Sequence, residues 1–347
     1  MAVSYLPALL HSCRNRNKPV IRCVINYPMT QKIMNNAGFT TRSEQRLIWA
    51  TTRSLLEADN YKHRKYGKKV RRRWSLFEGL IQVFGMAVRC TPLYRRGLEN
   101  ARRIAVNRVD LAFDDLPQPF DGYTILHLTD LHLDFTPGIA TAICERIREL
   151  TVDLCVLTGD YRAAISGGFK QILDPMGQIV SSIRAKDGIY ATLGNHDSYM
   201  MVDCFEQMGM TVMANESTEI AKDGSRIWVT GLDDPYYYYT DQAIRALEET
   251  PDGFKIALVH APSLYDDAAA NGYRLYLSGH THGGQICLPG GLPVIVHLRH
   301  GRRFYRGLWH HDKMVGYTSQ GTGTVGIPLR FNTQSEVALF MLKRKQS

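Results

Sequence analysis

The sequence has few cysteines, and none of them forms a pattern typical of a disulfide framework or a zinc site. Seven cysteines are scattered among 347 residues without a CxxC pair. An odd and dispersed set of this kind favours a reducing compartment. A secretory signal is also missing, because the short apolar stretch in residues 1–13 has no basic residue ahead of it. We therefore expect a cytoplasmic protein, or one at the cytoplasmic face of a membrane.

Acidic residues are scarce in the first third of the chain. Residues 1–110 contain 22 Lys and Arg but only 6 Asp and Glu, a net charge of +16. Residues 111–347 contain 20 Lys and Arg against 27 Asp and Glu, a net charge of −7. This asymmetry indicates a basic arm that meets an anionic surface, either a membrane or a nucleic acid, joined to an acidic body. We predict a basic extension over residues 1–110 and a single large domain over residues 111–347.

Long hydrophobic runs are missing from the extension, which excludes a spanning helix there. Within residues 74–89 apolar side chains recur at helical spacing, which predicts an amphipathic helix. Its apolar span of about 15 residues is shorter than the roughly 20 that cross a bilayer core. Basic clusters at 68–73 and 95–96 flank it, so it suits a membrane interface. A helix packed on the protein body is the alternative, and the sequence leaves both open. The apolar side chains are Trp74, Phe77, Leu80, Ile81, Phe84 and Val88.

From Tyr123 onward, short apolar runs alternate with helical stretches, which is typical of β-α units. A helix is expected from 137 to 150 and another within 163–186. Residues 217–232 predict a hairpin that turns at Asp223–Gly224. Strands are expected at 123–128, 152–157, 189–193, 254–259, 274–278, 293–298, 314–319 and 336–342. The pattern predicts an α/β fold.

Polar side chains that bind metals follow several of these expected strands. Loops at the carboxyl ends of strands converge in an open α/β sheet, so one edge can gather them into one site. An isolated Asp-x-His or Gly-Asp arises by chance, whereas the strings at 194–197 (GNHD) and 279–284 (GHTHGG) are specific. The candidate metal ligands are Asp130, His132, Asp160, Asn195, His260, His280 and His282, and His196 directly follows Asn195.

The types of these side chains indicate the metal. Carboxylate, amide oxygen and imidazole suit borderline or hard divalent ions, and no thiolate is present to select a soft one. Seven ligands exceed what one catalytic ion takes while leaving a position for water, so two ions are expected. Asp160 is the natural bridge between them. We expect Mn²⁺, with Fe²⁺ or Zn²⁺ as alternatives.

The order DLH, GD, GNHD, VH and GHTHGGQ resembles the calcineurin-like metallophosphoesterase family over about residues 121–343. The resemblance implies a four-layer α/β/β/α sandwich and hydrolysis of a phosphate ester or anhydride. It also implies that His196 is a general acid for the leaving oxygen, or a stabiliser of the transition state. One implied metal site comprises Asp130, His132, Asp160 and His282, and the other Asp160, Asn195, His260 and His280.

Departures from the family pattern narrow the substrate. Protein Ser/Thr phosphatases carry GDxxDRG where residues 159–164 read GDYRAA, so protein phosphatase activity is disfavoured. The GHTHGGQ string and residues 321–331 resemble the bacterial branch with small phosphodiesterases and the UDP-2,3-diacylglucosamine pyrophosphatases of lipid A biosynthesis. The leading hypothesis is a binuclear hydrolase of phosphodiester or pyrophosphate bonds, acting on a lipid-linked or nucleotide-sugar substrate at the membrane surface.

Two other features bear on the substrate. Four arginines, Arg299, Arg302, Arg303 and Arg306, are candidates for gripping a second phosphate. The tyrosine run 236–239 is a candidate wall for a base or for acyl chains. A second hypothesis is a nuclease or cyclic-nucleotide phosphodiesterase whose basic arm binds phosphates. A third hypothesis is a non-catalytic, metal-stabilised binding module. The complete set of candidate ligands counts against it, because a degenerate relative would be expected to have lost some of them.

Overall fold

The computed structural model describes residues 42–66, 79, 83, 85–298 and 300–345. Residues 46–347 form one compact unit, and the contacts given below lie within it. Among the helices of the described residues, none combines the length and the apolar character that crossing a membrane requires.

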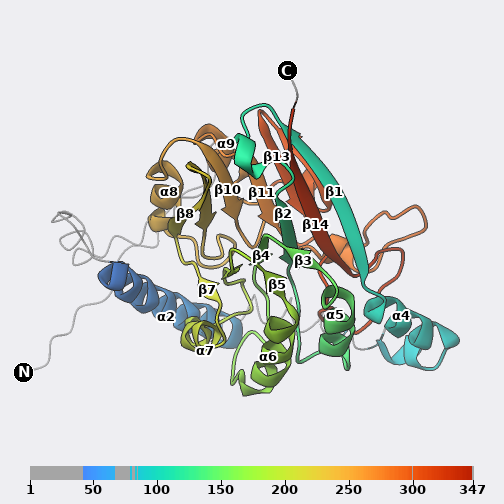
Figure 1. The fold of residues 1–347 in the computed structure, drawn as a ribbon. Coiled ribbons are helices and arrows are strands. Elements are labelled where there is room, and N and C mark those ends of the chain that lie inside the picture. The colour runs from blue at the N-terminus through green and yellow to red at the C-terminus, as the bar shows by residue number, and fades with distance from the viewer. Residues whose placement is uncertain (1–41, 67–78, 80–82, 84, 299, 346–347) are drawn as a thin grey trace, which may run out of the picture. The chain divides into compact units, whose positions relative to one another are not determined.

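The first sheet has six strands and is mostly parallel (Figure 1). Its spatial order is β1 (Ala105–Phe113), β14 (Glu336–Arg344), β2 (Thr124–Leu128), β4 (Leu154–Leu157), β6 (Ile189–Ala191) and β7 (Thr211–Val212). Strand β14 runs parallel to β1 and antiparallel to β2, so it joins the first strand to the rest of the sheet. Strands β2, β4, β6 and β7 are parallel to one another, which sends their carboxyl ends to one edge.

The second sheet also has six strands, and its four central strands are parallel. Its spatial order is β12 (Gly307–His311), β13 (Met314–Thr318), β11 (Leu275–Ser278), β10 (Phe254–Leu258), β9 (Ser225–Gly231) and β8 (Glu216–Lys222). Strands β13, β11, β10 and β9 are parallel, while β12 and β8 close the two sides as antiparallel strands. A short separate ladder joins β3 (Thr151–Val152) to β5 (Arg184–Ala185).

Alternation along the strands separates the hydrophobic cores. In β2, Ile125 belongs to a core between the two sheets, whereas its neighbour Leu126 faces the other way, toward helices. Strand β10 divides likewise, with Ile256 between the sheets and Ala257 on the outer side. Helices α5 (Ile139–Ile147), α6 (Leu173–Ser182) and α7 (Val202–Gln207) cover the first sheet, and α8 (Asp241–Glu248) and α9 (Tyr265–Ala270) the second. The predicted four-layer α/β/β/α sandwich is confirmed.

Most expected elements are present, with local corrections. The hairpin is confirmed, because β8 and β9 flank Asp223 and Gly224. The prediction of a strand at 293–298 is wrong, because this segment is irregular. Pro293 lacks the N–H that a strand ladder needs, and an isolated bridge to Cys287 is its only pairing. Strands β1 and β12 were not predicted. Short 3₁₀ turns complete the description, at Gln118–Phe120, Lys170–Ile172, Tyr199–Met201, His282–Gly284 and Arg302–Phe304.

The basic first third contributes two described helices, α2 (Arg42–Tyr66) and α4 (Pro92–Arg102). The predicted amphipathic helix over 74–89 lies mostly outside the described residues; of it, 85–89 are helical and Val88 is buried. The division at residue 110 stays a prediction. Contacts nevertheless cross it, since β1 begins at Ala105 and pairs with β14, and Trp49 of α2 is buried against the outer face of the first sheet.

Candidate metal centre

Each candidate ligand lies just beyond a strand. Asp130 and His132 follow β2, Asp160 follows β4, and Asn195 follows β6 in the first sheet. From the second sheet, His260 follows β10, while His280 and His282 follow β11. Because the parallel strands of each sheet end at one edge, the side chains of both sheets meet there, as predicted. All seven are at least nine-tenths buried.

Five of the seven candidate ligands have left-handed backbone angles. This region is uncommon for residues other than glycine, and such strain concentrates at functional sites. The five residues are Asp130 (φ 52°), His132 (φ 41°), Asp160 (φ 60°), His280 (φ 73°) and His282 (φ 53°). The surrounding contacts therefore hold the loops in conformations that point several side chains inward at once.

Two glycines allow the loops of the GD and GNHD strings to touch. Gly159 has a φ of +92°, and a side chain there would lie 2.3 Å from the nitrogen of Gly194. A side chain on Gly194 would in turn lie 2.2 Å from a carboxylate oxygen of Asp160. Only residues without a Cβ fit this approach. The glycines of both strings are therefore explained by how closely Asp160 lies against the next loop.

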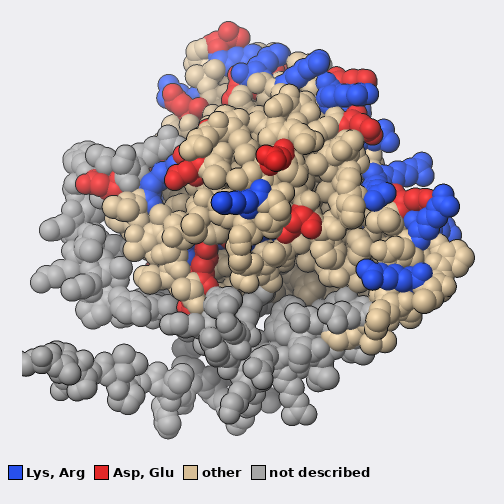
Figure 2. Space-filling view, turned by 90° about the horizontal axis from the view of Figure 1, so that it is seen from below, with Lys and Arg blue, Asp and Glu red and all other residues tan. Residues whose placement is uncertain are grey.

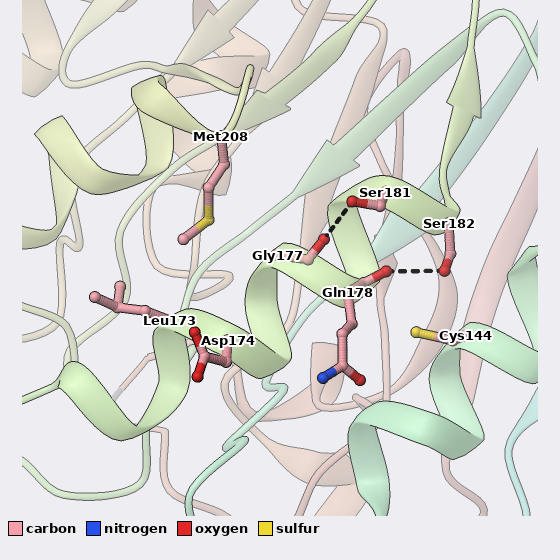
Figure 3. Close-up of a pocket in the computed structure, with 8 residues that line it drawn as sticks. All are labelled: Cys144, Leu173, Asp174, Gly177, Gln178, Ser181, Ser182 and Met208. Atoms are coloured by element: carbon pink, nitrogen blue, oxygen red, sulfur yellow. Dashed lines mark hydrogen bonds between the residues drawn. The ribbon is translucent and has the colours of Figure 1, made fainter.

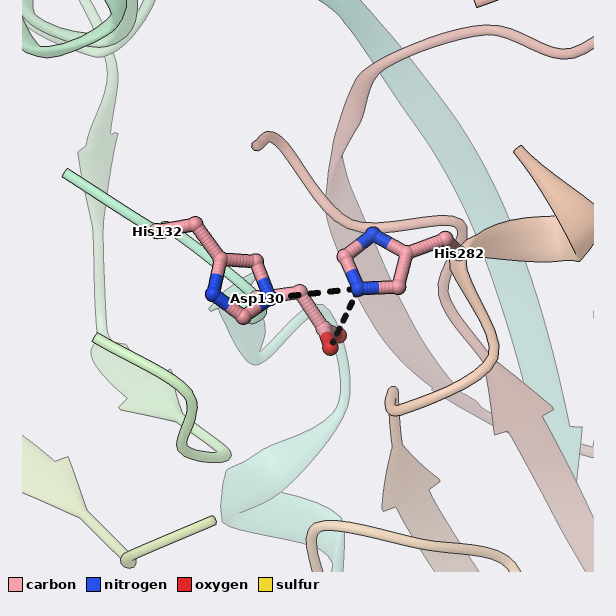
Figure 4. A group of neighbouring side chains, drawn as sticks. All are labelled: Asp130, His132 and His282. Atoms are coloured by element: carbon pink, nitrogen blue, oxygen red, sulfur yellow. Dashed lines mark hydrogen bonds and ion pairs between the residues drawn. The ribbon is translucent and has the colours of Figure 1, made fainter. Parts of the chain in front are cut away.

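One half of the centre consists of Asp130, His132 and His282 (Figure 4). The Nε2 atoms of the two histidines are 3.1 Å apart, and their rings stack at 5.0 Å between centroids. The Nε2 of His282 also lies 3.4 Å from Oδ1 of Asp130. Thr129 and the backbone N–H of His280 donate to the Asp130 carboxylate, which fixes its orientation.

The other half consists of Asn195, His260 and His280. The amide oxygen of Asn195 lies 3.1 Å from Nε2 of His260 and 2.8 Å from Nδ1 of His280. The two ring nitrogens are 3.2 Å from each other. Three atoms that can donate a lone pair thus face one small volume.

Asp160 lies between the two halves. Its Oδ2 is 3.8 Å from Nε2 of His132 on one side and 3.3 Å from Nε2 of His260 on the other. Nε2 of His196 lies 3.9 Å from the same oxygen. The position suits a carboxylate that bridges two ions. The role of Asp160, like that of the other ligands, stays a prediction.

The tautomers of three histidines test whether these residues fit metal ions. In each ring one nitrogen donates to a backbone carbonyl, which accepts a proton but has none to give. These bonds are His132 Nδ1 to Arg162 (2.9 Å), His260 Nδ1 to Thr158 (2.7 Å) and His280 Nε2 to His297 (2.9 Å). In the neutral ring, the second nitrogen of each therefore presents a lone pair to the centre. Lone pairs that converge without a donor between them suit a cation, so the donor set fits.

Electrostatics agree with this fit. Burial lowers the pKa of His132 to about 4 and places that of His280 well below its usual value. Burial also opposes charge on His260, but the carboxylates of Asp160 and Asp130 outweigh it and raise the pKa to about 10. Burial raises the pKa of Asp130 to about 7. Burial likewise opposes charge on Asp160, but His260 and His196 hold its pKa well below the usual value. Positive charge is therefore favourable beside His260, where a metal cation would take the place of the ring proton.

Sequence reasoning missed two arginines and the main contacts of Asp197. The Asp197 carboxylate accepts from the backbone N–H groups of Asp160 (2.7 Å), Tyr161 (2.9 Å) and Gly194 (2.7 Å). Arg330 is fully buried and donates to several carbonyls, among them that of His282 at 3.1 Å. Arg162 donates to the carbonyl of His196 at 2.7 Å. These three groups hold the loops from behind. Asp197 ends the GNHD string, whereas no local motif pointed to Arg162 or Arg330.

His196 lies beside the centre and is partly exposed. Its Nδ1 donates to the carbonyl of Ala163 at 2.6 Å, and its backbone N–H donates to Oδ1 of Asp160 at 2.9 Å. The carbonyl partner leaves Nε2 facing the centre, where it can hold or release a proton. The structure therefore places His196 where the prediction of a general acid requires it, and the role itself stays a prediction.

The predicted substrate arginines are less well defined. Arg299 lies outside the described residues. Arg302 and Arg303 are exposed, and Arg306 is half-buried with its guanidinium 5.3 Å from the ring centre of Tyr305. Of the tyrosine run, Tyr236 comes next to the centre, with its ring 4.5 Å from that of His280. Substrate binding by either group stays a prediction.

Comparisons with known proteins assign the family. Residues 123–284 match the model of the calcineurin-like phosphoesterase family. YkoQ and YkuE, two uncharacterized metallophosphoesterases of Bacillus subtilis, are similar to this chain. YkoQ is 26% identical over 72% of the chain and 95% of its own length. YkuE is 30% identical over 66% of the chain and 82% of its own length. The chain belongs to the calcineurin-like phosphoesterase family and is a metal-dependent phosphoester hydrolase.

Solved structures show a weaker likeness. The 5'-nucleotidase precursor from Thermus thermophilus is 14% identical, with a TM-score of 0.39 over 63% of this chain and 54% of that one. The chain spans about half the length of that structure. At this TM-score the likeness supports no inference about activity.

Proposed function

We propose that this protein hydrolyses phosphodiester or pyrophosphate bonds with two divalent ions, of which Mn²⁺ is preferred. The observation that carries the proposal is the position of Asp160, whose Oδ2 lies within 3.9 Å of His132, His196 and His260. One ion would be held by Asp130, His132, Asp160 and His282, and the other by Asp160, Asn195, His260 and His280. When bound, such a pair supplies an activated water and positive charge for the phosphate oxygens.

Residues of the chain would position the metal ions, supply a proton and bind the substrate. Asp160 keeps the two halves of the centre at a fixed separation. Its own loop is fixed because the backbone N–H groups of Asp160 and Tyr161 donate to the Asp197 carboxylate. His196 donates a proton from Nε2 to the leaving oxygen, while the carbonyl of Ala163 keeps its other nitrogen protonated. Arg302, Arg303 and Arg306 offer guanidinium groups to a second phosphate, which a pyrophosphate or a diester of a nucleotide carries.

A lipid-linked substrate is favoured by an exposed apolar segment beside the centre. The apolar loop, residues 288–295, exposes Leu288 (52%), Leu292 (64%), Val294 (58%) and Ile295 (38%). Two residues further on, the carbonyl of His297 accepts from the candidate ligand His280. Exposed clusters of large apolar side chains mark surfaces that contact membranes or partners. We propose a substrate such as UDP-2,3-diacylglucosamine, met at the cytoplasmic face of a membrane.

Positively charged side chains of helix α4 lie near this apolar loop. Phe331 links it to α4, because its carbonyl accepts the N–H of Cys287 and its ring packs against Gly97. Figure 2 shows Lys and Arg gathered on the side of the molecule where α4 lies. Helix α4 and the residue after it expose Arg95, Arg96, Arg102 and Arg103. Near anionic headgroups each such charge contributes on the order of 1 kcal/mol, which adds to the apolar contact.

The second candidate is a nuclease or cyclic-nucleotide phosphodiesterase. It is favoured by Tyr236, whose ring beside His280 could stack on a base. A non-catalytic binding module is the weakest proposal, since every predicted ligand is present and converges on the centre.

One screen separates these functions. Purified protein with Mn²⁺ is offered bis(p-nitrophenyl) phosphate, its monoester, UDP-2,3-diacylglucosamine in anionic vesicles and a short DNA. We expect fast hydrolysis of the lipid substrate and slower hydrolysis of the model diester. Leu292→Asp with Val294→Asp should slow only the vesicle reaction, whereas the control Leu308→Asp, an exposed leucine of β12, should not. Preferred hydrolysis of DNA would reject the lipid proposal.

A further inference from the structure

Helix α2 contacts the loops behind the metal centre through one face. Trp49, Arg53 and Glu57 recur at intervals of four residues and point to the same side. The indole N–H of Trp49 donates to Asp233 at 2.8 Å. Glu57 accepts from the hydroxyl of Ser198 at 2.8 Å. Residues from the basic first third therefore touch the segment that directly follows Asn195 and His196.

Arg53 is at the middle of this face and is fully buried. Its Nη2 donates to the carbonyls of Gly194 and Asp197, both at 3.0 Å. These two carbonyls bracket Asn195 and His196 in the chain. Its Nη1 pairs with Asp233, and its Nε donates to Glu57 at 3.0 Å.

A ring also covers one face of the Arg53 guanidinium, which stacks 3.5 Å from the ring centre of Tyr238. All three nitrogens of the group and one of its faces are thus engaged. A planar fork with five N–H donors can hold two carbonyls and a carboxylate together, whereas an ammonium cannot reach them all.

We propose that Arg53 is a positioning residue, which holds Asn195 and His196 at the distance from Asp160 that the reaction needs. The inference rests on the proposed function of those two residues. Gly194 makes the loop conformationally free, so its geometry depends on outside bonds, and Arg53 bonds both of its ends. Displacement of a catalytic group by about 1 Å is enough to slow a reaction by roughly a hundredfold.

The same helix also reaches the tyrosine run. Asp233 pairs with Arg53, and the next residue, Asp234, accepts the backbone N–H groups of Tyr236 and Tyr237. Tyr236 in turn lies against His280. A substitution at Arg53 is therefore expected to affect both the loop that carries Asn195 and the tyrosine that lies against His280.

The test compares Arg53→Lys with Arg46→Lys in the full chain. Arg46 lies on the same helix but pairs with Glu206 and Glu216, away from the centre. We expect Arg53→Lys to lower kcat for a diester with a poor alkoxide leaving group by roughly ten- to hundredfold, and to change KM little. Mn²⁺ binding, followed by calorimetry, should weaken for one ion. Arg46→Lys should leave kcat and Mn²⁺ binding unchanged.

A double variant distinguishes positioning from general stabilisation. At saturating Mn²⁺, adding Arg53→Lys to His196→Ala should cost little further rate if Arg53 acts through His196, because the positioned group is already gone and excess metal keeps the Asn195 half occupied. A full additional loss under these conditions would overturn the proposal. So would an equal loss from Arg46→Lys.

Two further outcomes are informative. If Arg53→Lys does not fold, Glu57→Gln replaces it, since this variant keeps one acceptor oxygen and should show a smaller loss in the same direction; parental rate and Mn²⁺ binding in Glu57→Gln would then count against the proposal. If His196→Ala retains the parental rate, the proposed acid is wrong. The Arg53 proposal is then judged on Mn²⁺ binding alone, and parental binding by Arg53→Lys overturns it.

Discussion

The metal centre and a broad hollow on the helical face of the first sheet make an instructive comparison. The hollow has a volume of about 750 Å³ and is lined by Cys144 of α5, by several residues of α6 and by Met208 (Figure 3). Its two serine hydroxyls bond within their own helix, as Ser181 and Ser182 donate to the carbonyls of Gly177 and Gln178. The residues of the centre, by contrast, direct lone pairs at one another.

The difference shows that volume does not indicate chemistry in this fold. None of the residues that line the hollow has a left-handed backbone. The loops of the centre, by contrast, keep residues such as Asp160 and His282 in left-handed conformations that cost energy. Strain and converging acceptors identify the reactive edge, and a matched set of substitutions in both regions measures the contrast.

The largest effect is expected at Asp160. Asp160→Ala should abolish hydrolysis and leave fewer than two metal ions per chain, because one carboxylate serves both halves. Chelation should have the same effect on the parent, reversed by Mn²⁺. Metal content by mass spectrometry and turnover of bis(p-nitrophenyl) phosphate provide the measurements. Normal turnover with two ions bound in Asp160→Ala would show that Asp160 does not bridge two ions, and would contradict the assignment of the metal centre.

His196 should come next. His196→Ala should retain the metals and lose roughly a hundred- to ten-thousandfold in rate, as is typical for a lost general acid. The loss should shrink for p-nitrophenol and grow for an alkoxide leaving group, since only the latter needs a proton. Equal losses for both leaving groups, measured at saturating substrate, would contradict the role.

A moderate effect is expected at Asp197. The Asp197 carboxylate accepts the N–H groups of Asp160 and Gly194 on one oxygen and that of Tyr161 on the other, so Asp197→Asn places an amide NH₂ against at least one of them. The Asp160 loop should loosen, and metal affinity should fall by roughly ten- to hundredfold. Calorimetric titration with Mn²⁺ checks this. Unchanged affinity would mean that the loop keeps its conformation without Asp197.

The smallest effect belongs to the hollow. Asp174→Ala, the same chemical change as Asp160→Ala, and Gln178→Ala should alter kcat and metal content by less than about twofold, as exposed substitutions usually do. The kinetic assay used for Asp160→Ala provides the measurement. A strong loss of activity in either variant would show that the hollow takes part in function and would end the contrast.

The sequence predicted the strands that carry ligands because each is a short buried run followed by a polar string. The rule that parallel strands end together predicted that the ligands share one edge, whereas the grouping of Asp130 with His282 came from the resemblance to the family. Strand β1 was missed, since polar residues such as Asn107 and Arg108 interrupt its pattern. Arg53 was missed for a related reason: an arginine in a basic segment suggests solvent exposure, and only the folded chain supplies the carbonyls that justify burying it.

The pairing of β14 with both β1 and β2 has a consequence for synthesis on the ribosome. Residues 105–113 bond to residues 336–344, and the latter also bond to β2. Until residues 336–344 emerge, β1 lacks its partner strand and one side of β2 remains an open edge. Contacts so distant in sequence form slowly, and an open edge can pair with other chains. Completion of the first sheet therefore waits until residues 336–344 have been synthesised, and nascent chains stalled before β14 should be the species that chaperones bind.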